Sequence, residues 1–443
     1  DGLSDFYIGG GKKQAGVLYL QQIDGSFLAS EQLVFKENAN KEETDNLFFD
    51  ADKDGDMDLL IVSGGNEYLP GKELQIKLFR NNKGIFTNSS TFPNIAVNAS
   101  VVKSVDLDND GDLDLVIGSN AVPRKFGKTA KNYVLYNDGN GNFEDVTESK
   151  AKDFREVGLV EDIQIVDLNN DHLPDFIAVG HWMPIAVFMN SDEGFNLASN
   201  NNLENSHGLW NTIRAADFDQ DGDIDFIAGN WGLNSMLKAG ISDPMRLYIS
   251  DFDQNGKEEA ILSYYHQGIE TVFSSKDDLS KQLPSINKKF LSYHDFAEAE
   301  FSEVFDKKLL KKAIKKEVFE LSTCYFENIG DGQFKKHALP FLTQISSTKT
   351  IYLNDFNKDG FIDALLGGND HDISTQLGRL DASHGLLLIN DKTGSFSIDQ
   401  HTIPDISGKL RDIDEIHIQD DKYLIITLNN ASPQFINIKT IHD

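Results

Sequence analysis

Residues 50–58 read Asp-Ala-Asp-Lys-Asp-Gly-Asp-Met-Asp, and this nine-residue pattern decides the fold. It recurs as Asp-Leu-Asp-Asn-Asp-Gly-Asp-Leu-Asp at 106–114 and as Asp-Phe-Asp-Gln-Asp-Gly-Asp-Ile-Asp at 217–225. Each copy carries side-chain oxygens at positions 1, 3, 5 and 9 around a glycine at position 6. Calcium takes about six to eight oxygen ligands, and alternate residues of a tight loop converge on one ion where a small residue permits the turn. The pattern therefore predicts calcium sites.

Three weaker copies extend the series, at 167–175, 251–259 and 355–363. Asn and Glu still supply oxygen in these copies, although His172 replaces the glycine and Glu259 is longer than the usual aspartate, so that Glu258 competes for its role. A partial copy opens the chain, because the five residues from Asp1 to Asp5 read as positions 5 to 9 of the loop. We therefore expect five or six calcium ions, and a chain that begins inside a repeat.

The formal net charge of −30 arises in part from these loops, since 25 of the 71 acidic residues lie in the six full copies. Such an excess of acid argues against nucleic-acid binding, because phosphates need Lys and Arg. Carboxylates crowded in one loop repel each other, so the chain should be less stable without calcium. Calcium loops of weak or moderate affinity fill where free calcium is high, which favours an extracellular or periplasmic location.

The remaining composition adds few constraints. A single cysteine, Cys324, excludes an internal disulfide framework, and its apolar, strand-like surroundings predict a buried and inert thiol. No run of 18 apolar residues is present, so we expect no transmembrane segment.

The six loops begin 56, 61, 50, 34 and 104 residues apart, which suits a repeated unit of a few strands. A buried-strand pattern ending in glycine follows most of the loops, as from Leu59 to Gly65. Downstream comes an Asn, then a glycine, then Phe, as from Asn137 to Phe143, which predicts a hairpin whose phenylalanine anchors the outer strand to the neighbouring unit. The repeats predict an all-β fold, a β-propeller of about seven four-stranded blades spanning residues 1–443 as a single domain.

Two segments depart from this repeat pattern. The loop at 217 has no hairpin signature before the loop at 251, so the two loops share a blade or form two abbreviated blades. Residues 275–322 place apolar side chains at helical spacing and are predicted to form a helical insertion. The apolar positions are Phe301, Val304, Phe305, Leu309, Leu310, Ile314 and Val318.

Two other interpretations of the acidic loops compete with the propeller. An EF-hand needs a glutamate at position 12, but that position holds Ile61, Ile117 and Ala228 in the three strong copies. The other alternative is an acidic turn that binds no metal. If calcium binds, its simplest role is to hold two strands together.

The loops, the strands that follow them and the endings Gly64-Gly65-Asn66 and Gly367-Gly368-Asn369 resemble the FG-GAP or VCBS repeat family. Its calcium-loop propellers include the integrin α-subunit head and many bacterial surface proteins. The resemblance covers nearly the whole chain and implies the fold and the metal more firmly than the activity. Three features together make the chain resemble long secreted or outer-membrane-associated proteins of the Bacteroidota. They are the segments 230–235 and 378–385 and the predicted helical insertion at 275–322.

In related loops the side chains at positions 1, 3, 5 and 9 bind calcium, and position 7 contributes its carbonyl. Carried over to this sequence, the resemblance implies the following ligands: Asp50, Asp52, Asp54, Asp56 and Asp58; Asp106, Asp108, Asp110, Asp112 and Asp114; Asp167, Asn169, Asp171, Leu173 and Asp175; Asp217, Asp219, Asp221, Asp223 and Asp225; Asp251, Asp253, Asn255, Lys257 and Glu259; Asp355, Asn357, Asp359, Phe361 and Asp363.

Two further groups of residues are candidates for contact with a partner. The aromatic and basic side chains that follow inner strands could stack on a sugar at one end of the propeller channel, or pack between blades; they are Trp182, Trp210, Trp231, Arg379 and His384. Six lysines between Lys307 and Lys316 fall on one side of the predicted helix, as a docking face for an acidic partner or as a solvated surface.

These features together predict a non-catalytic, calcium-stabilised propeller on the bacterial outer-membrane surface or in the periplasm. It would bind a protein or glycan partner as an adhesion or accessory module of a larger outer-membrane assembly. The alternative is a polysaccharide lyase or hydrolase built on a calcium-binding propeller, since some calcium-bearing propellers cleave acidic glycans. No nucleophile elbow, phosphate loop or zinc-spaced ligand set is visible in the sequence.

Overall fold

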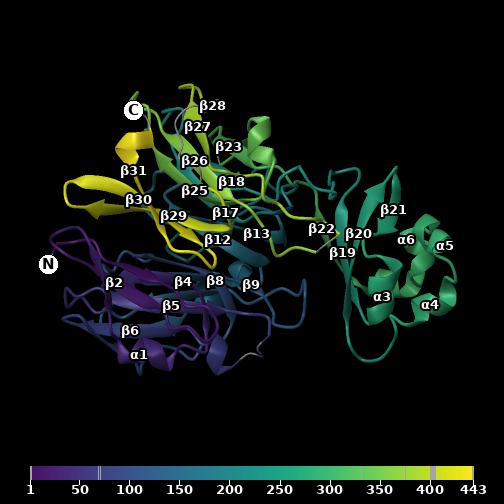
Figure 1. Cartoon of the computed structure of the whole chain (residues 1–443), viewed down its shortest axis with the longest axis horizontal. Coiled ribbons are helices and arrows are strands. Elements are labelled where there is room, and N and C mark those ends of the chain that lie inside the picture. The colour runs from purple at the N-terminus through teal and green to yellow at the C-terminus, as the bar shows by residue number, and fades with distance from the viewer. Residues whose placement is uncertain are drawn as a thin grey trace.

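A computed structural model describes residues 2–67, 69, 71–330, 332–374, 376–399 and 406–441 of the chain. The described residues form eight antiparallel sheets. Figure 1 shows most of the sheets gathered in one body, with one sheet and a group of helices projecting from its side. Asp1, which opens the partial loop copy, lies outside the described residues.

Five sheets of the main body contain a run of four neighbouring strands, and in all but one of them these four strands are consecutive in the chain. Strand β16 (Gly208–Leu209) pairs in addition with β13. The five sheets are β4 (Glu42–Phe49), β5 (Asp58–Gly64), β6 (Lys77–Asn82) and β7 (Ile85–Asn88); β8 (Asn98–Val105), β9 (Asp114–Ala121), β10 (Tyr133–Asn137) and β11 (Phe143–Asp145); β12 (Leu159–Val166), β13 (Asp175–Met183), β14 (Ala186–Met189) and β15 (Asn196–Leu197); β17 (Thr212–Ala216), β18 (Asp225–Gly229), β23 (Cys324–Asn328) and β24 (Phe334–Ala338); and β25 (Thr348–Asn354), β26 (Asp363–Gly368), β27 (Leu386–Asn390) and β28 (Phe396–Asp399).

The first and last sheets of the main body have three strands each. They are β1 (Phe6–Ile8), β2 (Val17–Gln21) and β3 (Phe27–Ser30), and β29 (Leu410–Ile418), β30 (Asp421–Leu428) and β31 (Gln434–Asn437). These two sheets contact each other, because the rings of Phe27 and Phe435 stack with centroids 5.5 Å apart and Gln21 Nε2 donates a 2.7 Å hydrogen bond to the carbonyl of His417. The two ends of the chain are therefore brought together.

The first strands of six successive sheets form an inner layer. Each contacts the next in the order β4, β8, β12, β17, β25 and β29. Apolar clusters fill the space between neighbouring sheets, and the predicted phenylalanine anchors lie in them. Phe143 of β11, for example, packs against Phe49 of β4 with ring centroids 6.2 Å apart. The predicted anchoring of outer strands to the neighbouring unit is confirmed.

The chain leaves the main body after β18 and returns at β23, and Ala228 of β18 pairs directly with Cys324 of β23. The loop at 217 thus belongs to a sheet whose hairpin lies at Asn328–Phe334, more than a hundred residues downstream. Between these strands the chain forms a separate sheet, in the order β21 (Ile269–Val272), β20 (Glu259–His266), β19 (Met245–Ser250) and β22 (Ile314–Val318). The loop at 251 joins β19 to β20, so the two loops neither share a blade nor form two abbreviated ones.

Helices cover one face of this inserted sheet (Figure 1). They are α3 (Lys276–Gln282), α4 (Ser285–Lys289), α5 (Tyr293–Glu298), α6 (Phe301–Val304) and α7 (Lys307–Lys312). Ile314 and Val318, predicted at helical positions, lie instead in strand β22, where pairing with β19 overrides the local spacing. Lys315 and Lys316 are therefore not part of a helical lysine face, and Lys316 donates a 3.1 Å hydrogen bond to Thr129 of the main body.

The other helices are short and lie between strands, except for the last, which follows β31. They are α1 (Leu33–Glu37) and α2 (Thr147–Lys150), with the 3-10 turns η1 (Lys72–Leu74), η2 (Lys152–Phe154), η3 (Phe341–Gln344) and η4 (Ile438–Ile441). Within the described residues, no helix has the length and apolar character needed to cross a membrane.

Candidate calcium centres

The six acidic loops have one backbone geometry. In each, position 4 adopts a left-handed conformation, with φ between 58° and 61°, and position 6 adopts a second one, with φ between 70° and 98°. Glycine occupies position 6 in five loops because it adopts positive φ without steric cost. His172 takes the same conformation at φ 70°, and its side chain is exposed, so it replaces the glycine without changing the loop.

Hydrogen bonds inside each loop turn the carboxylates inward. The N–H of position 6 donates to the carboxylate at position 1, as from Gly111 to Asp106 Oδ2 at 2.9 Å and from His172 to Asp167 Oδ2 at 2.8 Å. The N–H of position 7 donates to position 5, as from Asp112 to Asp110 Oδ1 at 2.9 Å. The backbone therefore orients the side chains at positions 1 and 5 without occupying all of their oxygens.

Position 9 holds the loop onto the sheet. Asp114 Oδ2 accepts from the N–H of Leu107 at position 2, and its Oδ1 accepts from the N–H of Asn137 on the third strand. Asp175, Asp225 and Asp363 make the same pair of bonds. Burial raises the pKa of Asp114 and of Asp225 to about 7 and that of Asp175 to about 6, so these carboxylates are costly to ionise without a cation.

Carboxylate oxygens converge in four of the loops. In each of these groups the ligand atoms lie within 4.8 Å of one another. The groups are Asp50, Asp52 and Asp54; Asp106, Asp108 and Asp114; Asp217, Asp219 and Asp225; and Asp251, Asp253 and Glu259. Glu259 also accepts from Phe252 at 2.9 Å and so acts as position 9, whereas Glu258 forms an ion pair with Lys128 of the main body.

Unpartnered oxygens test whether a cation fits these loops. Within the described residues, Asp50 Oδ1, Asp52 Oδ1 and Asp217 Oδ1 are buried and have no hydrogen-bond partner. A buried carboxylate oxygen without a partner is energetically costly, and a hard divalent cation bound by oxygen ligands removes that cost. The donor set, carboxylates with one amide or backbone oxygen, suits calcium.

The loops at 167 and 355 contain fewer carboxylates because position 3 is Asn169 or Asn357. In the first of them, the Asn169 amide donates a 2.9 Å hydrogen bond to Asp171, and this bond takes up one oxygen at position 5. These loops keep the same backbone as the others, so they retain the turn while offering a cation less negative charge.

The loop at 50 contains a cation from the protein itself. Arg80 Nη1 lies 2.9 Å from Asp52 Oδ2 and 2.8 Å from Asp58 Oδ2, between positions 3 and 9. The equivalent residue before the hairpin asparagine is Tyr136, Met189, Glu327 or Ile389 in other sheets. Sequence analysis missed this guanidinium, although its place beside Asn81 in the repeat could have revealed it.

The five loops of the main body lie side by side, because residues at position 4 reach the next loop. Lys53 forms an ion pair with Asp112, Asn170 donates to the carbonyl of Gly222, and Gln220 donates to the carbonyl of Gly360. Apart from the polar character of position 4, no sequence pattern predicts these contacts. They connect neighbouring candidate metal centres.

A network of polar side chains lies at the other end of the strands. His181 pairs in register with Leu159, the first residue of β12, whereas the loop at 167 follows the last residue of that strand. His181 contacts Glu161 and Asn211, and Lys349 bonds to Asn211 at 2.9 Å and to Asp370 at 3.2 Å. The main body therefore has one end formed by the acidic loops and an opposite end of mixed charge.

The predicted ligand-binding aromatic residues lie in the core. Trp210 is fully buried and donates to the carbonyl of Ser206, while Trp182 and Trp231 pack in the cluster that joins the main body to the inserted sheet. Buried ring faces fit the packing interpretation better than sugar stacking. The structure brings neither Trp210 nor the pair of Trp182 and Trp231 to the surface.

Arg379 and His384 lie near the first residues of β29. Arg379 lines a polar cavity of about 460 Å³ together with His371 and Lys409, and His371 Nε2 is buried without a hydrogen-bond partner within the described residues. His384 lies beside this region, where its carbonyl accepts from the N–H of Ile406. Cys324 is buried, as predicted, and burial raises the pKa of its thiol to about 12.

Comparison with known proteins identifies the repeats. The FG-GAP-like repeat family matches three overlapping segments, residues 50–117, 106–178 and 167–228. Each segment begins at one acidic loop and ends in the strand that follows the next acidic loop. No curated protein matches the chain.

Three solved structures align with most of the chain at low sequence identity. The V. cholerae biofilm matrix protein Bap1 is 12% identical, with a TM-score of 0.30, over 90% of this chain and 87% of that one. The Dos1 propeller is 9% identical, with a TM-score of 0.41, over 98% and 88%. The exotype rhamnogalacturonan lyase YesX is 10% identical, with a TM-score of 0.36, over 98% and 70%.

Proposed function

We propose that the chain is a β-propeller of the FG-GAP repeat family, whose model matches residues 50–228, and that it is a calcium-stabilised, non-catalytic binding module outside the cytoplasm. Seven of its sheets act as blades, calcium holds the loops at one end, and the inserted sheet presents a surface to a protein or glycan partner. FG-GAP repeats are typical of extracellular proteins, which supports a location at the cell surface or in the periplasm.

The observation that carries this proposal is the set of buried, unpartnered carboxylate oxygens at Asp50, Asp52 and Asp217. All six loops have the same backbone conformation, so we expect the same kind of ligand to bind to each of them. Each loop joins two strands of one sheet, and in the five loops of the main body position 9 ties the loop to a third strand. Calcium bound there would hold three strands and the neighbouring loop in place.

The count of seven blades is supported by the contacts between sheets. Six first strands follow one another around the inner layer, and the sheet of β1–β3 lies between the sheet of β4–β7 and that of β29–β31. Together these sheets return to their starting point. The eighth sheet stands outside this circuit, because it is inserted between β18 and β23.

The non-catalytic assignment is supported by how the loops use their oxygens. Ligands at positions 1, 3, 5 and 9 come from one contiguous segment that also accepts backbone hydrogen bonds, so a bound ion has little reason to contact a substrate. A lyase or hydrolase would need a calcium ion with open coordination positions beside a cleft with converging acid and base groups.

Thermal unfolding with and without chelator tests the calcium part. The purified chain should melt at a clearly higher temperature in millimolar calcium than in EDTA, and magnesium should restore the loss only in part, because its octahedral preference suits these loops poorly. Equal melting temperatures in calcium and in EDTA would contradict the proposal that calcium stabilises the fold.

A panel of acidic and neutral polysaccharides tests the binding part against the enzyme alternative. Retention of a polysaccharide or surface protein without new reducing ends or unsaturated products supports the binding module. Turnover of a polysaccharide by the calcium-loaded chain would replace this proposal with the lyase or hydrolase.

A further inference from the structure

The sheet of β1–β3 has an open edge where the other sheets of the main body have a further strand. In a four-stranded sheet the strand after the acidic loop is paired on both sides, as β5 is with β4 and β6. β1 follows the partial loop copy, yet among the described strands it pairs only with β2. An unpaired edge presents a row of backbone N–H and C=O groups that can pair with another chain.

Asp5 shows that β1 corresponds to β5 and its counterparts. Asp5 Oδ1 accepts a 2.8 Å hydrogen bond from the N–H of Gln21 on the next strand, as position 9 does in the complete loops of the main body. Asp114 is buried and accepts a second bond from Leu107 at position 2 of its loop, whereas Asp5 is exposed and has no second donor among the described residues. The open edge therefore begins where a first strand would pass into its loop.

The side chains of β1 are less covered than those of its counterparts. Phe6 and Ile8 are half-buried, whereas every residue of β5 and of β18 is buried. Both faces of β1 are packed, because the ring centroids of Phe6 and Phe435 lie 5.9 Å apart and Tyr7 packs against the sheet of β4–β7. The exposure of β1 therefore arises at its inner edge.

An unused acceptor lies on β29, the first strand of the adjacent sheet. Asp412 follows a register shift in that strand, and Asp45 of β4 and Asp162 of β12 hold the same place. Asp45 Oδ2 accepts an N–H from the next first strand, that of Val102 at 2.9 Å. Asp162 Oδ2 accepts the N–H of Ile213 at 3.0 Å in the same way. An aspartate at this place therefore ties one inner strand to the next.

Asp412 lacks this bond to a next strand. The N–H of Ile413 and the hydroxyl of Thr350 both donate to its Oδ1, at 2.9 Å and 3.1 Å, and Arg214 lies 4.0 Å from the same atom. Within the described part of the chain no donor reaches Oδ2, and the side chain is 57% exposed, compared with 11% for Asp162. Asp412 can therefore accept an N–H from a strand placed beside β29.

We propose that the opening between β29 and β4 binds one extended segment of a partner polypeptide, which pairs antiparallel with β1. One backbone N–H of this segment donates to Asp412 Oδ2, and a later one donates to Asp5. The inference goes beyond the proposed function, which assigns partner contact to the inserted sheet, and it rests on that function only for the arrangement of the blades.

The sequence of β8 describes the strand that fits this opening. β8 lies between β4 and β12, the first strands that carry Asp45 and Asp162, and the opening likewise lies between two such strands, β29 and β4. Residues 98–109 contain β8 and the first four positions of its loop. A partner segment of this pattern supplies both N–H groups, at the residues equivalent to Val102 and Leu107.

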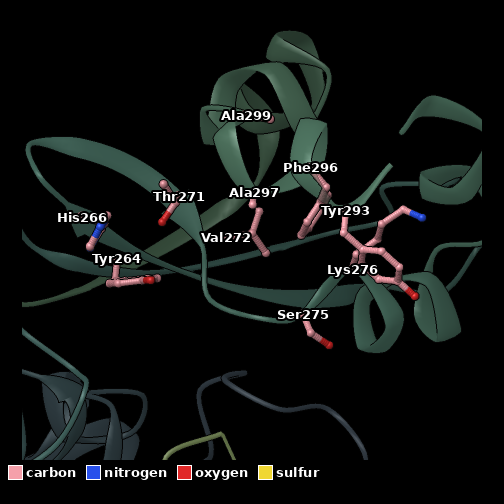
Figure 2. Close-up of a pocket in the computed structure, with 10 residues that line it drawn as sticks. All are labelled: Tyr264, His266, Thr271, Val272, Ser275, Lys276, Tyr293, Phe296, Ala297 and Ala299. Carbon is pink, nitrogen blue, oxygen red and sulfur yellow. The ribbon is translucent and has the colours of Figure 1, made fainter. Parts of the chain in front are cut away.

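The edge strand β21 of the inserted sheet does not offer an equivalent site. Figure 2 shows Phe296 and Ala297 of α5 around the same cavity as Val272 of β21, and α6 contacts this strand as well. Helices that cover an edge strand protect it from pairing with another chain. Strand addition is therefore expected at β1 and not at β21.

Calorimetric titration of the calcium-loaded full chain with a synthetic peptide tests the proposal. The peptide copies residues 98–109, Asn-Ala-Ser-Val-Val-Lys-Ser-Val-Asp-Leu-Asp-Asn. We expect one peptide per chain, a Kd on the order of 10 µM and a higher melting temperature, because a ligand that binds only the folded chain stabilises it. No binding, or a dimer of the chain that occupies the edge and excludes the peptide, would overturn the proposal.

Methylation of one backbone nitrogen of the peptide locates the contact. N-methylation at the residue that copies Val102 removes the donor to Asp412 and should weaken binding about tenfold or more. N-methylation at the residue that copies Ser104 is the matched control, because residues two apart in a strand direct their N–H groups to the same side, and it should change the Kd less than about twofold. Equal losses from the two peptides would overturn the predicted pairing.

A variant of the chain tests the same contact from the other side. Asp412→Asn should weaken binding of the unmodified peptide about fivefold or more, whereas Asp414→Asn removes an exposed charge from the same strand and should have little effect. Asp412→Asn should cause no further loss with the peptide methylated at Val102, since both changes remove one hydrogen bond. Additive losses would show that these two groups do not meet, and the proposal would fail.

The strand site and the calcium scaffold fail in different ways. Absence of peptide binding, with a melting temperature that still depends on calcium, would remove only the strand site. A melting temperature independent of calcium would remove calcium stabilisation, whether or not the peptide binds.

Discussion

Asp114 and Asn137 are joined by a 2.8 Å hydrogen bond from the asparagine N–H to Asp114 Oδ1, and the same bond recurs between Asp225 and Asn328 at 2.7 Å. One carboxylate thus links the last position of an acidic loop to the third strand of its sheet. The Asn137 side chain extends the link, because its amide donates to the carbonyl of Ala51 in the preceding loop. Loop, sheet and neighbouring sheet are connected through two residues.

Asp114→Asn should destabilise the chain even without calcium. Both carboxylate oxygens of Asp114 accept hydrogen bonds from backbone N–H groups. The side-chain amide of an asparagine would point its NH₂ group at one of these donors, so one hydrogen bond would be lost. We expect a loss of about 1–3 kcal/mol in the free energy of unfolding, measured by urea denaturation in EDTA. The exposed Asp153→Asn makes the same charge change and should be nearly neutral. Equal stability of the two variants would contradict the structural role of position 9.

The stability of Asp45→Asn relative to the parent chain should depend on pH. Burial raises the pKa of Asp45 from 3.8 to about 6, with Asp412 adding to this effect and Lys103 opposing it. Because the folded pKa exceeds the unfolded one, the folded chain favours protonated Asp45. That stabilisation is complete below about pH 4 and is lost as the pH rises through about 6.

Asparagine does not ionise, so the variant should gain stability relative to the parent chain between about pH 4 and pH 7. Urea unfolding at several pH values in this range, with Asp153→Asn as a reference, measures the difference. A difference that stays constant or shrinks as the pH rises would show that Asp45 does not titrate in this way.

Arg80→Met should strengthen calcium binding at the loop at 50. Arg80 holds oxygens of Asp52 and Asp58 that a cation would otherwise use, and methionine occupies the equivalent position at Met189. We expect about a tenfold gain in affinity at this site, equivalent to about 1.4 kcal/mol, and a lower stability in EDTA. Calcium titration of Arg80→Met beside Lys83→Met, which removes an exposed charge nearby, checks this; weaker binding by Arg80→Met would refute it.

Asp219→Asn should lower the number of tightly bound calcium ions by one. Asp219 lies in a group of converging oxygens with Asp217 and Asp225, whereas position 7 of the loop, Asp223, is expected to contribute only its carbonyl. Asp223→Asn therefore removes a charge from the same loop but should leave the metal count unchanged. Elemental analysis after dialysis at fixed free calcium gives the number of calcium ions bound by each variant. Identical numbers for the two variants would show that the Asp219 side chain is no more a calcium ligand than the Asp223 side chain.

Much of this fold could be predicted from residues 50–58 and their copies. Spacing and apolar runs predicted all-β sheets with loops between their first two strands, and Phe143 lies where the hairpin pattern placed it. The insertion was harder to delimit. Strand β22 is rich in lysine, and only its long-range pairing with β19 makes Ile314 and Val318 strand residues.

The candidate sites show the same division. The convergence of acidic side chains within one loop could be predicted because it follows from local spacing. Contacts between loops, such as Gln220 with Gly360, depend on how neighbouring sheets are placed and have no local signal.

Ala228 and Cys324 lie opposite each other although 95 residues separate them, since the excursion between β18 and β23 starts and ends at adjacent points of one sheet. A segment attached in this way behaves as an exchangeable cassette. Its length and content can change over evolution, or by engineering, while the strand registers on either side stay as they are. Related chains can therefore share one scaffold and yet differ in what they recognise.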